Sequence, residues 1–202
     1  MRVISIFICV FLCGSLSEAC AEDITPSFSQ KLDIQVRYDN RSNRPSREQY
    51  RLRYYPSLSL TSTWSVNSFI VTGDDFSSSH NTFGSDTTDY LYARRLYLRH
   101  ETNAGKTELG IIPTYKGRVS STGLSKDGWI TGIRHVRKLQ NNTALEIVVG
   151  QLANAEASEA FNVGEEDEYF EIEYSAKMGE RHSYEASFER MLNGTFARAE
   201  YR

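Results

Sequence analysis

Apolar and polar residues alternate along most of this chain, and this period of two is the feature that most constrains its fold. Between Phe28 and Tyr38 the even-numbered positions are apolar except for Gln30, while polar residues such as Lys31 and Asp33 stand between them. Successive side chains of a β-strand point to opposite faces of a sheet, so this segment is predicted to be a strand with one apolar and one polar face. No segment of the sequence shows a convincing helical stripe of apolar residues.

The same pattern recurs in ten segments. The second of them, from Gln49 to Leu60, is about a dozen residues long, whereas strands of ordinary globular sheets have about five or six residues. We therefore expect an all-β, antiparallel fold. Its strands are predicted at residues 28–38, 49–60, 64–72, 90–101, 106–113, 129–139, 143–152, 168–176, 182–191 and 195–202.

The connections between these strands alternate in length. Short connections are expected at residues 61–63, 102–105, 140–142 and 177–180. Longer polar connections are expected at residues 40–47, 73–89, 114–128 and 153–167. Only Asn193-Gly194 is tight where a long loop is due. A membrane barrel has tight turns at one rim and extended loops at the other, so the order predicts an up-and-down transmembrane β-barrel of about ten strands.

The N-terminus indicates the compartment. Met1-Arg2 is followed by the apolar run Val3–Leu12 and then by Ser17-Glu18-Ala19-Cys20-Ala21, which has small residues at positions −3 and −1 of a cleavage site. The apolar run is well short of the ~20 residues that a membrane-spanning helix needs. We expect residues 1–21 to be a cleavable signal peptide and residues 22–202 to form one barrel domain, exported to the bacterial outer membrane. The three cysteines all lie in the signal segment: Cys9, Cys13 and Cys20.

The composition excludes several classes of protein. With 24% charged residues and three cysteines in 202 residues, the chain is neither a helical multispan membrane protein nor a disulfide-stapled miniprotein. It holds 12 Tyr and 10 Phe, an aromatic content that needs a core or a lipid surface. In a barrel, Tyr and Phe near strand ends would form the interfacial girdles. Aromatic residues are also favoured in any β-strand, which keeps a secreted β-sandwich binding module as an alternative.

The alternation assigns charged residues to the interior of the barrel. In the first half of the chain the inward charged positions are mainly basic, with the acidic Asp33, Asp39 and Glu101 among them. The basic ones are Lys31, Arg37, Arg51, Arg53, Arg95 and Arg99. In the second half they are acidic: Glu146, Glu171, Glu173, Glu185 and Glu189. Opposed basic and acidic ladders would set a transverse field across a wet pore, and the arginines would favour anionic solutes. In a narrow barrel the same ladders would form salt bridges and plug the lumen.

Four stretches of the sequence carry a family pattern. They are Leu60-Thr61-Ser62-Thr63-Trp64, Thr72-Gly73-Asp74-Asp75-Phe76, Arg94-Arg95-Leu96-Tyr97-Leu98 and Gly110-Ile111-Ile112-Pro113. They resemble the early strands of bacterial outer-membrane porins of the alginate-export or anion-selective kind, in which a paired-Arg strand precedes a Gly-x-x-Pro strand that enters a long loop. The resemblance spans residues 28–176 and implies passive diffusion of small solutes.

The resemblance leaves two forms of the barrel open. Such porins are usually about twice as long as this chain and tend to end on an aromatic residue, whereas this sequence ends Ala199-Glu200-Tyr201-Arg202. The chain is therefore expected to be either a small barrel or the N-terminal portion of a larger one. A non-conducting structural or adhesive outer-membrane barrel, working through its long loops, is the functional alternative.

The sequence predicts no enzyme and no cofactor. The nearest approach to a catalytic group is Asp74-Asp75 with His80, but adjacent Asp residues in a Gly-Asp-Asp stretch are more often turn formers. The other histidines lack the spacing of metal ligands, and no metal site is predicted. These histidines are His100, His135 and His182.

The expected partners follow from the compartment. They are outer-membrane lipid and lipopolysaccharide, small solutes, the barrel-assembly machinery and, in a homo-oligomer, further copies of the chain. The acidic run Glu165-Glu166-Asp167-Glu168 could hold Ca²⁺ or bridge divalent cations to lipopolysaccharide phosphates, although such a run is usually a solvated loop. With a net charge of −3 and no basic patch, the sequence predicts no binding of nucleic acid.

Overall fold

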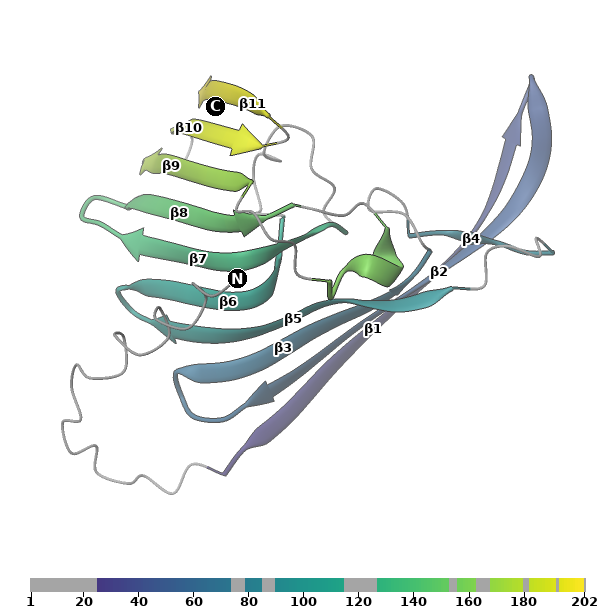
Figure 1. Ribbon diagram of the computed structural model, residues 1–202, viewed down its shortest axis with the longest axis horizontal. Helices are drawn as coiled ribbons and strands as arrows, with labels where there is room; N and C mark the ends of the chain where they lie inside the picture. The colour runs from purple at the N-terminus through teal and green to yellow at the C-terminus, as the bar shows by residue number, and fades with distance from the viewer. Residues whose placement is uncertain are drawn as a thin grey trace, which may run out of the picture.

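The computed structural model describes residues 25–73, 79–84, 90–114, 127–152, 156–162, 168–179, 182–191 and 193–201. In these residues the chain is all-β, as the alternation predicted (Figure 1). The strands are β1 (Ser27–Arg41), β2 (Arg44–Ser59), β3 (Trp64–Thr72), β4 (Asn81–Thr82), β5 (Leu91–Thr102), β6 (Gly105–Pro113), β7 (Trp129–Lys138), β8 (Thr143–Gln151), β9 (Tyr169–Met178), β10 (His182–Met191) and β11 (Gly194–Tyr201). A short 3₁₀ helix, η2 (Ala157–Glu159), lies between β8 and β9.

All strands belong to one antiparallel sheet, in the order β1-β2-β3-β5-β6-β7-β8-β9-β10-β11, with β4 paired to β2 beside this path. Apart from the two-residue β4, each strand pairs with the next one along the chain, so the predicted antiparallel up-and-down class is confirmed. Figure 1 shows β6 to β11 stacked as a curved wall, while β1 and β2 run on as a long hairpin beyond the other strands. Among the described residues β1 pairs only with β2, and β11 only with β10. Closure of the sheet into a barrel remains a prediction.

One predicted connection is wrong. Residues 40–47, expected to be a long polar loop, continue the two strands to a turn at Ser42 and Asn43. The ends of the hairpin are joined across the strands, since Arg47 forms an ion pair of 3.0 Å with Asp39. Strand β4 was not predicted either, and it pairs with β2 near Gln49. The first connection is therefore tight, whereas those after β3, β6 and β8 are long, as expected. We call the side of the sheet at which these long connections join the strand ends the long-loop end. The side at the other ends of the strands is the short-turn end.

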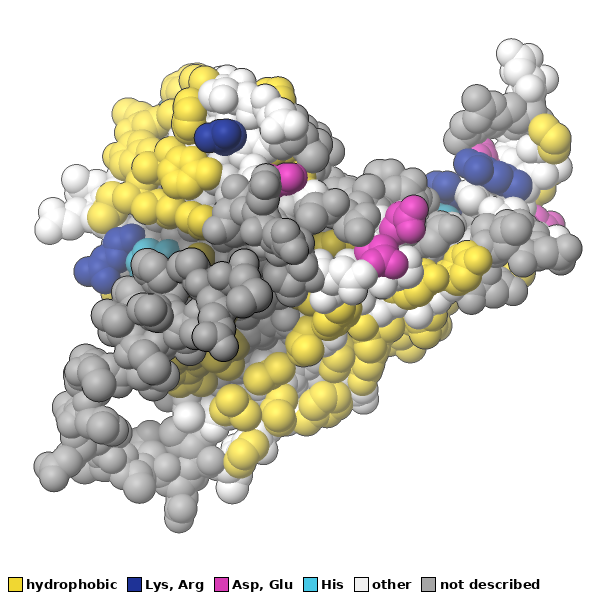
Figure 2. Space-filling view, in the orientation of Figure 1, with side chains coloured by type: hydrophobic (Ala, Val, Ile, Leu, Met, Phe, Trp, Pro, Cys, Tyr) yellow, Lys and Arg dark blue, Asp and Glu magenta, His cyan; other side chains and the backbone are white. Residues whose placement is uncertain are grey.

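The two faces of the sheet have opposite chemistry. On one face, which we call the outer face, large apolar side chains are exposed, among them Ile34 at 65% and Val36 at 69%. On the other, the inner face, charged side chains are buried, among them Glu108 at 0% and Arg134 at 2% exposure. Figure 2 shows hydrophobic side chains gathered along the long hairpin and again over β8 to β11. This distribution is the reverse of that in a soluble protein, in which charged residues are almost never fully buried unless paired.

A row of glycines bends the wall of β6 to β8. Gly110, Gly132 and Gly150 stand opposite one another on three adjacent strands, with Tyr97 and Tyr169 at the two ends of the row. A Cβ atom added at Gly132 would lie 2.2 Å from the carbonyl oxygen of Val149, and one at Gly150 would lie 2.4 Å from that of Thr131. No side chain fits there, and glycine at such positions lets a sheet curve sharply.

Apolar side chains fill the inner face at the long-loop end of the curved wall. This inner apolar cluster consists of Ile112, Ile130, Val148, Leu152, Tyr169 and Met191, and Tyr97 packs against it. A second cluster joins Ile111 and Trp129 to residues of and beside η2, Ala157 and Ala160. None of the described residues forms a helix long and apolar enough to span a membrane.

Candidate functional site

Charged side chains of the inner face form three groups, which follow one another around the sheet. We call the first the arginine cluster: Arg37, Arg51, Arg53, Arg94 and Arg95, on β1, β2 and β5. The second is an ion-pair chain that crosses β5 to β8. The third is a glutamate wall on β8 to β10. Along the sheet the first group is basic, the charges of the second neutralise one another, and the third group is acidic.

Arg53 anchors the arginine cluster to the connection that precedes β7. Its Nη2 donates hydrogen bonds of 2.8 and 2.7 Å to the two carboxylate oxygens of Asp127. The Ser79 hydroxyl donates a third bond of 2.8 Å to the same carboxylate. Burial acts to raise the pKa of Asp127, but these hydrogen bonds and the charges of Arg53 and Arg95 outweigh it and hold the pKa below its usual value. Asp127 is therefore an ionised carboxylate within the basic cluster.

A β-bulge explains why two consecutive arginines are both buried. The pairing of β3 with β5 shifts between Phe69 and Ile70, which stand opposite Arg95 and Ala93, so Arg94 is the extra residue. Arg95 donates a 2.8 Å hydrogen bond to the carbonyl oxygen of Gly128, and its guanidinium lies 4.5 Å from the centre of the Phe69 ring. Arg94 donates to the carbonyl oxygens of Thr72 and Gly73, at 3.2 and 2.8 Å.

The remaining members of the cluster, Arg37 and Arg51, form no ion pair with a carboxylate of the described residues. Arg37 donates to the side-chain oxygen of Gln49, at 2.9 and 2.6 Å. Among the described residues no carboxylate forms an ion pair with Arg51, whose Nε has no hydrogen-bond partner. Burial, together with the charges of Arg37, Arg51 and Arg53, lowers the pKa of the nearby His80 to about 4. His80 is therefore uncharged at neutral pH, and the cluster keeps an excess of positive charge.

The ion-pair chain neutralises the middle of the inner face. Glu108 on β6 pairs with Arg99 at 2.7 Å, with Arg134 at 2.9 Å and with Lys106 at 3.4 Å. Arg134 on β7 also pairs with Glu146 on β8, at 2.8 Å. Glu108 and Arg134 are buried, so the bond between them lies in a medium of low dielectric constant, in which removing one partner is costly.

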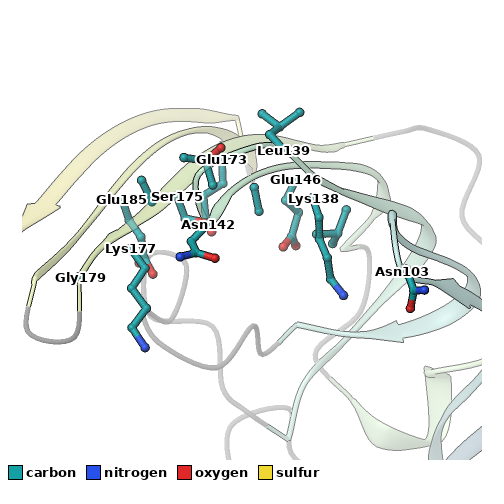
Figure 3. Close-up of a pocket in the computed structure, with 14 residues that line it drawn as sticks. Asn103, Lys138, Leu139, Asn142, Glu146, Glu173, Ser175, Lys177, Gly179 and Glu185 are labelled. Atoms are coloured by element: carbon teal, nitrogen blue, oxygen red, sulfur yellow. The ribbon is translucent and has the colours of Figure 1, made fainter.

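The glutamate wall continues this face on the next strands. Glu171 and Glu189 stand directly opposite each other on β9 and β10 and are both buried. The Tyr169 hydroxyl donates a 2.7 Å hydrogen bond to Glu171. Towards the short-turn end the wall borders a hollow of about 920 Å³, whose labelled carboxylates and lysines are shown in Figure 3. The charged residues that line it are Lys138, Glu146, Glu173, Lys177 and Glu185.

The structure brings the predicted residues together in part. Arg53 and Arg95 meet around Asp127 and Gly128, while Arg99 is connected to Glu146 through Glu108 and Arg134. The five predicted glutamates share the acidic wall, and Lys31 and Arg37 lie on the exposed β1. Whether these side chains line a pore stays a prediction.

Four buried charged residues are absent from the predicted set of inward charges: Arg94, Glu108, Asp127 and Arg134. Glu108 and Arg134 could have been found, because each occupies an inward position of the same alternation. Arg94 is displaced by the bulge, and Asp127 lies outside any strand, so the period of two gives no signal for them.

The other candidate residues either lie outside the described part of the chain or form no second site within it. Asp74-Asp75 and Glu165–Asp167 lie outside the described residues, as does the signal segment 1–21. His80 lies beside the arginine cluster. The remaining three histidines lie near the short-turn end of the sheet, and the part of the chain that the structure describes contains no group of three residues able to hold a metal ion.

Comparison with known proteins finds no protein family, no curated protein and no solved structure that matches this chain.

Proposed function

We propose that this protein is an outer-membrane, porin-like channel for the passive diffusion of small anionic solutes. The observation that carries the proposal is the inverted sheet: charged side chains are buried on its inner face while large apolar side chains are exposed on its outer face. Hydrocarbon satisfies no backbone polar groups, so a sheet in lipid must pair all its strands, with apolar residues outside and polar residues inside. The proposed location is the bacterial outer membrane, after removal of a signal peptide.

The dimensions of the apolar band support this position. On β1 it extends from Phe28 to Tyr38, with an aromatic residue at each end. At about 3.3 Å per residue and a tilt near 40°, this segment spans about 25 Å, which is the height of the apolar band on outer-membrane barrels. The polar end of the hairpin, with the exposed Arg47 and Asp39 pair, would project beyond the lipid into water.

The arginine cluster supports the choice of anions. Lys31, Arg37 and Arg51 form no ion pair with a described carboxylate. Among the acidic residues of the inner face, Glu108 and Glu146 are neutralised by Arg134 and Lys106. A solute that passes the basic wall would therefore meet net positive charge. Unpaired charges that face a wet pore set the sign of ions that enter it.

Planar bilayers test the proposal directly. Purified mature protein is added to one side of a bilayer with a KCl gradient, and the expected result is stepwise conductance with a reversal potential of the sign for anions. A reversal potential of the opposite sign would contradict the selectivity. Heat-modifiable mobility on a gel is a separate check of the barrel, because a closed detergent-resistant barrel migrates differently before and after boiling.

A second candidate is a non-conducting structural or adhesive barrel. The inner apolar cluster and the buried ion-pair chain favour it, since they fill the inner face of β6 to β8 with side chains. Heat-modifiable mobility without any conductance would select this alternative. The described strands form one sheet and not two packed sheets, so they do not support the β-sandwich alternative. Oligomerisation and recognition by the barrel-assembly machinery remain proposals of the same rank.

A further inference from the structure

The outer face carries an unusual polar patch at the short-turn end. His100, Thr107 and His135 stand opposite one another on β5, β6 and β7, in a row that is otherwise apolar. Arg137 is on the same face of β7, two residues nearer the turn. Figure 2 shows basic and histidine side chains next to each other at the left edge of the molecule, beside hydrophobic ones. We call His100, Thr107, His135 and Arg137 the outer basic patch.

The members of this patch are held in place but keep free hydrogen-bonding atoms. The Thr107 hydroxyl lies 2.9 Å from Nδ1 of His135, which leaves Nε2 of that ring for a ligand. The His100 ring stacks on Trp64, with ring centres 4.4 Å apart. Arg137 is exposed, and no described carboxylate forms an ion pair with it. The patch therefore presents one unneutralised guanidinium and two imidazoles to whatever covers the outer face.

A hollow lies between these side chains. Its volume is about 150 Å³, and Gly105 forms part of its lining between Arg137 and Thr102. A side chain cannot replace the hydrogen of Gly105, because a Cβ atom there would lie 2.0 Å from the carbonyl oxygen of Val136. The backbone thus requires a glycine at this point of the lining, and His100, His135 and Arg137 stand around the small basin.

The position of the patch along the strand indicates its ligand. Trp64 stands in the same row as His100, and tryptophan is enriched where a membrane meets water. Arg137 lies about 6.6 Å further towards the turn, at the depth of lipid headgroups if Trp64 marks the interface. A basic side chain at that depth attracts the phosphate of an anionic lipid.

We propose that the outer basic patch is a binding site for the phosphate group of one anionic phospholipid, in the leaflet at the short-turn end. This inference rests on the proposed position of the sheet in a membrane. The acyl chains would lie on the apolar surface that Leu98, Leu109 and Ile133 form along the outer face, one row nearer the middle of the strands. Arg137 supplies the charge, and His135 and His100 supply hydrogen bonds to phosphate oxygens.

Native mass spectrometry of the full mature chain tests the site. The protein is taken from nanodiscs that contain equal amounts of phosphatidylglycerol and phosphatidylcholine with the same acyl chains, and the bound lipid is counted. Wild type is expected to retain one phosphatidylglycerol. Arg137→Gln should weaken this binding about fivefold, His135→Gln should weaken it less, and Arg137→Lys should preserve most of it.

Arg190→Gln is the matched control. Arg190 is an exposed arginine on the outer face of β10, but it lies at the long-loop end, so its loss should leave lipid retention unchanged. Equal losses in Arg137→Gln and Arg190→Gln, or no preference for phosphatidylglycerol in wild type, would overturn the site. Displacement of the lipid by excess inorganic phosphate would assign the basin to free phosphate and overturn the lipid as its ligand.

The failure of the underlying proposal would look different. A chain that stays soluble and never enters nanodiscs overturns both the membrane position and the lipid site. A chain that enters nanodiscs and shows heat-modifiable mobility, but holds no particular lipid, overturns the lipid site alone. The same gel shows whether each variant has folded.

Discussion

The wall of β1 to β5 and the wall of β6 to β10 belong to one sheet, yet they use their inward charges in opposite ways. In the first wall Lys31, Arg37 and Arg51 have no carboxylate partner among the described residues. In the second wall Glu108 and Arg134 are buried in mutual ion pairs, beside an apolar cluster. A paired buried charge fixes strands relative to one another, whereas an accessible charge without an ionic partner acts on passing ions. The first wall is therefore suited to selecting ions by their charge, and the second wall is suited to holding its strands in a fixed arrangement.

The largest effect should come from breaking the ion-pair chain. Arg134→Ala leaves the buried Glu108 and the partly buried Glu146 without this guanidinium, and we expect the free energy of unfolding in micelles to fall by about 4 kcal/mol. Urea titration followed by tryptophan fluorescence measures it. Arg190→Gln, at an exposed position, should change it by less than about 0.5 kcal/mol. Equal effects of the two substitutions would show that the second wall does not depend on its ion pairs.

A side chain in the glycine row should be nearly as harmful to the second wall. Gly132→Val places a Cβ atom against the backbone of Val149 and Gly150, and the strands must move apart, at a cost of about 3 kcal/mol. Gly179→Ala is the control, since nothing lies within 4 Å of its Cβ position and only its φ of 69° opposes a side chain, at about 1 kcal/mol. Thermal transitions on semi-native gels compare the two variants. A Gly132→Val protein as stable as wild type would contradict the close approach of the strands.

In the first wall the most sensitive residue should be Asp127, whose carboxylate accepts two hydrogen bonds from Arg53. Asp127→Asn replaces charge-assisted hydrogen bonds and should cost about 2 kcal/mol at neutral pH. Because folding lowers the pKa of Asp127, its contribution is present above about pH 4 and is lost as the pH falls through the lowered folded-state pKa. Unfolding titrations at several pH values should thus show wild type and Asp127→Asn converging in acid. Parallel curves at all pH values would be the contrary result.

His80 should produce a milder dependence at higher pH. Folding lowers its pKa from 6.5 to about 4, so the unfolded chain binds more protons between these values. Stability should therefore fall as the pH drops from about 6.5 to 4, and His80→Asn should remove this part of the slope. If stability depends on pH in the same way in His80→Asn, the pKa of His80 is not lowered by burial and the arginine cluster.

The smallest effect should be on ion selectivity. Arg51→Gln removes one unpaired charge from the first wall, and the ratio of anion to cation permeability should fall about twofold, as expected for one charge acting through water over several Å. Lys177→Gln, at the border of the large hollow, is the comparison within the second wall, and it should have the smaller effect. Reversal potentials in bilayers measure both. A larger effect of Lys177→Gln would exchange the roles assigned to the two walls.

The sequence was sufficient to locate the strands, but not to predict which face every side chain lies on or which side chains pair. A period of two is a local property, and it placed the ten main strands to within about three residues, apart from the ends of β1 and β2 at their shared turn. It failed at residues 40–47 because their polar composition is typical of a loop, although cross-strand pairs such as Asp39 and Arg47 extend the hairpin. It also failed at Arg94, since a bulge moves a residue to the other face without changing the sequence pattern. Long-range partners such as Arg53 and Asp127, 74 positions apart, have no local signature.

The glycine row has a consequence for the calibre of any pore that this sheet encloses. The tightness of the bend at Gly110, Gly132 and Gly150 depends on the absence of three side chains, so the radius of the wall and the size of these residues are coupled. A wider lumen would need a flatter sheet, and a flatter sheet would leave room for larger residues at the same three positions. The size of the residues in this one row is thus related to the width of the lumen.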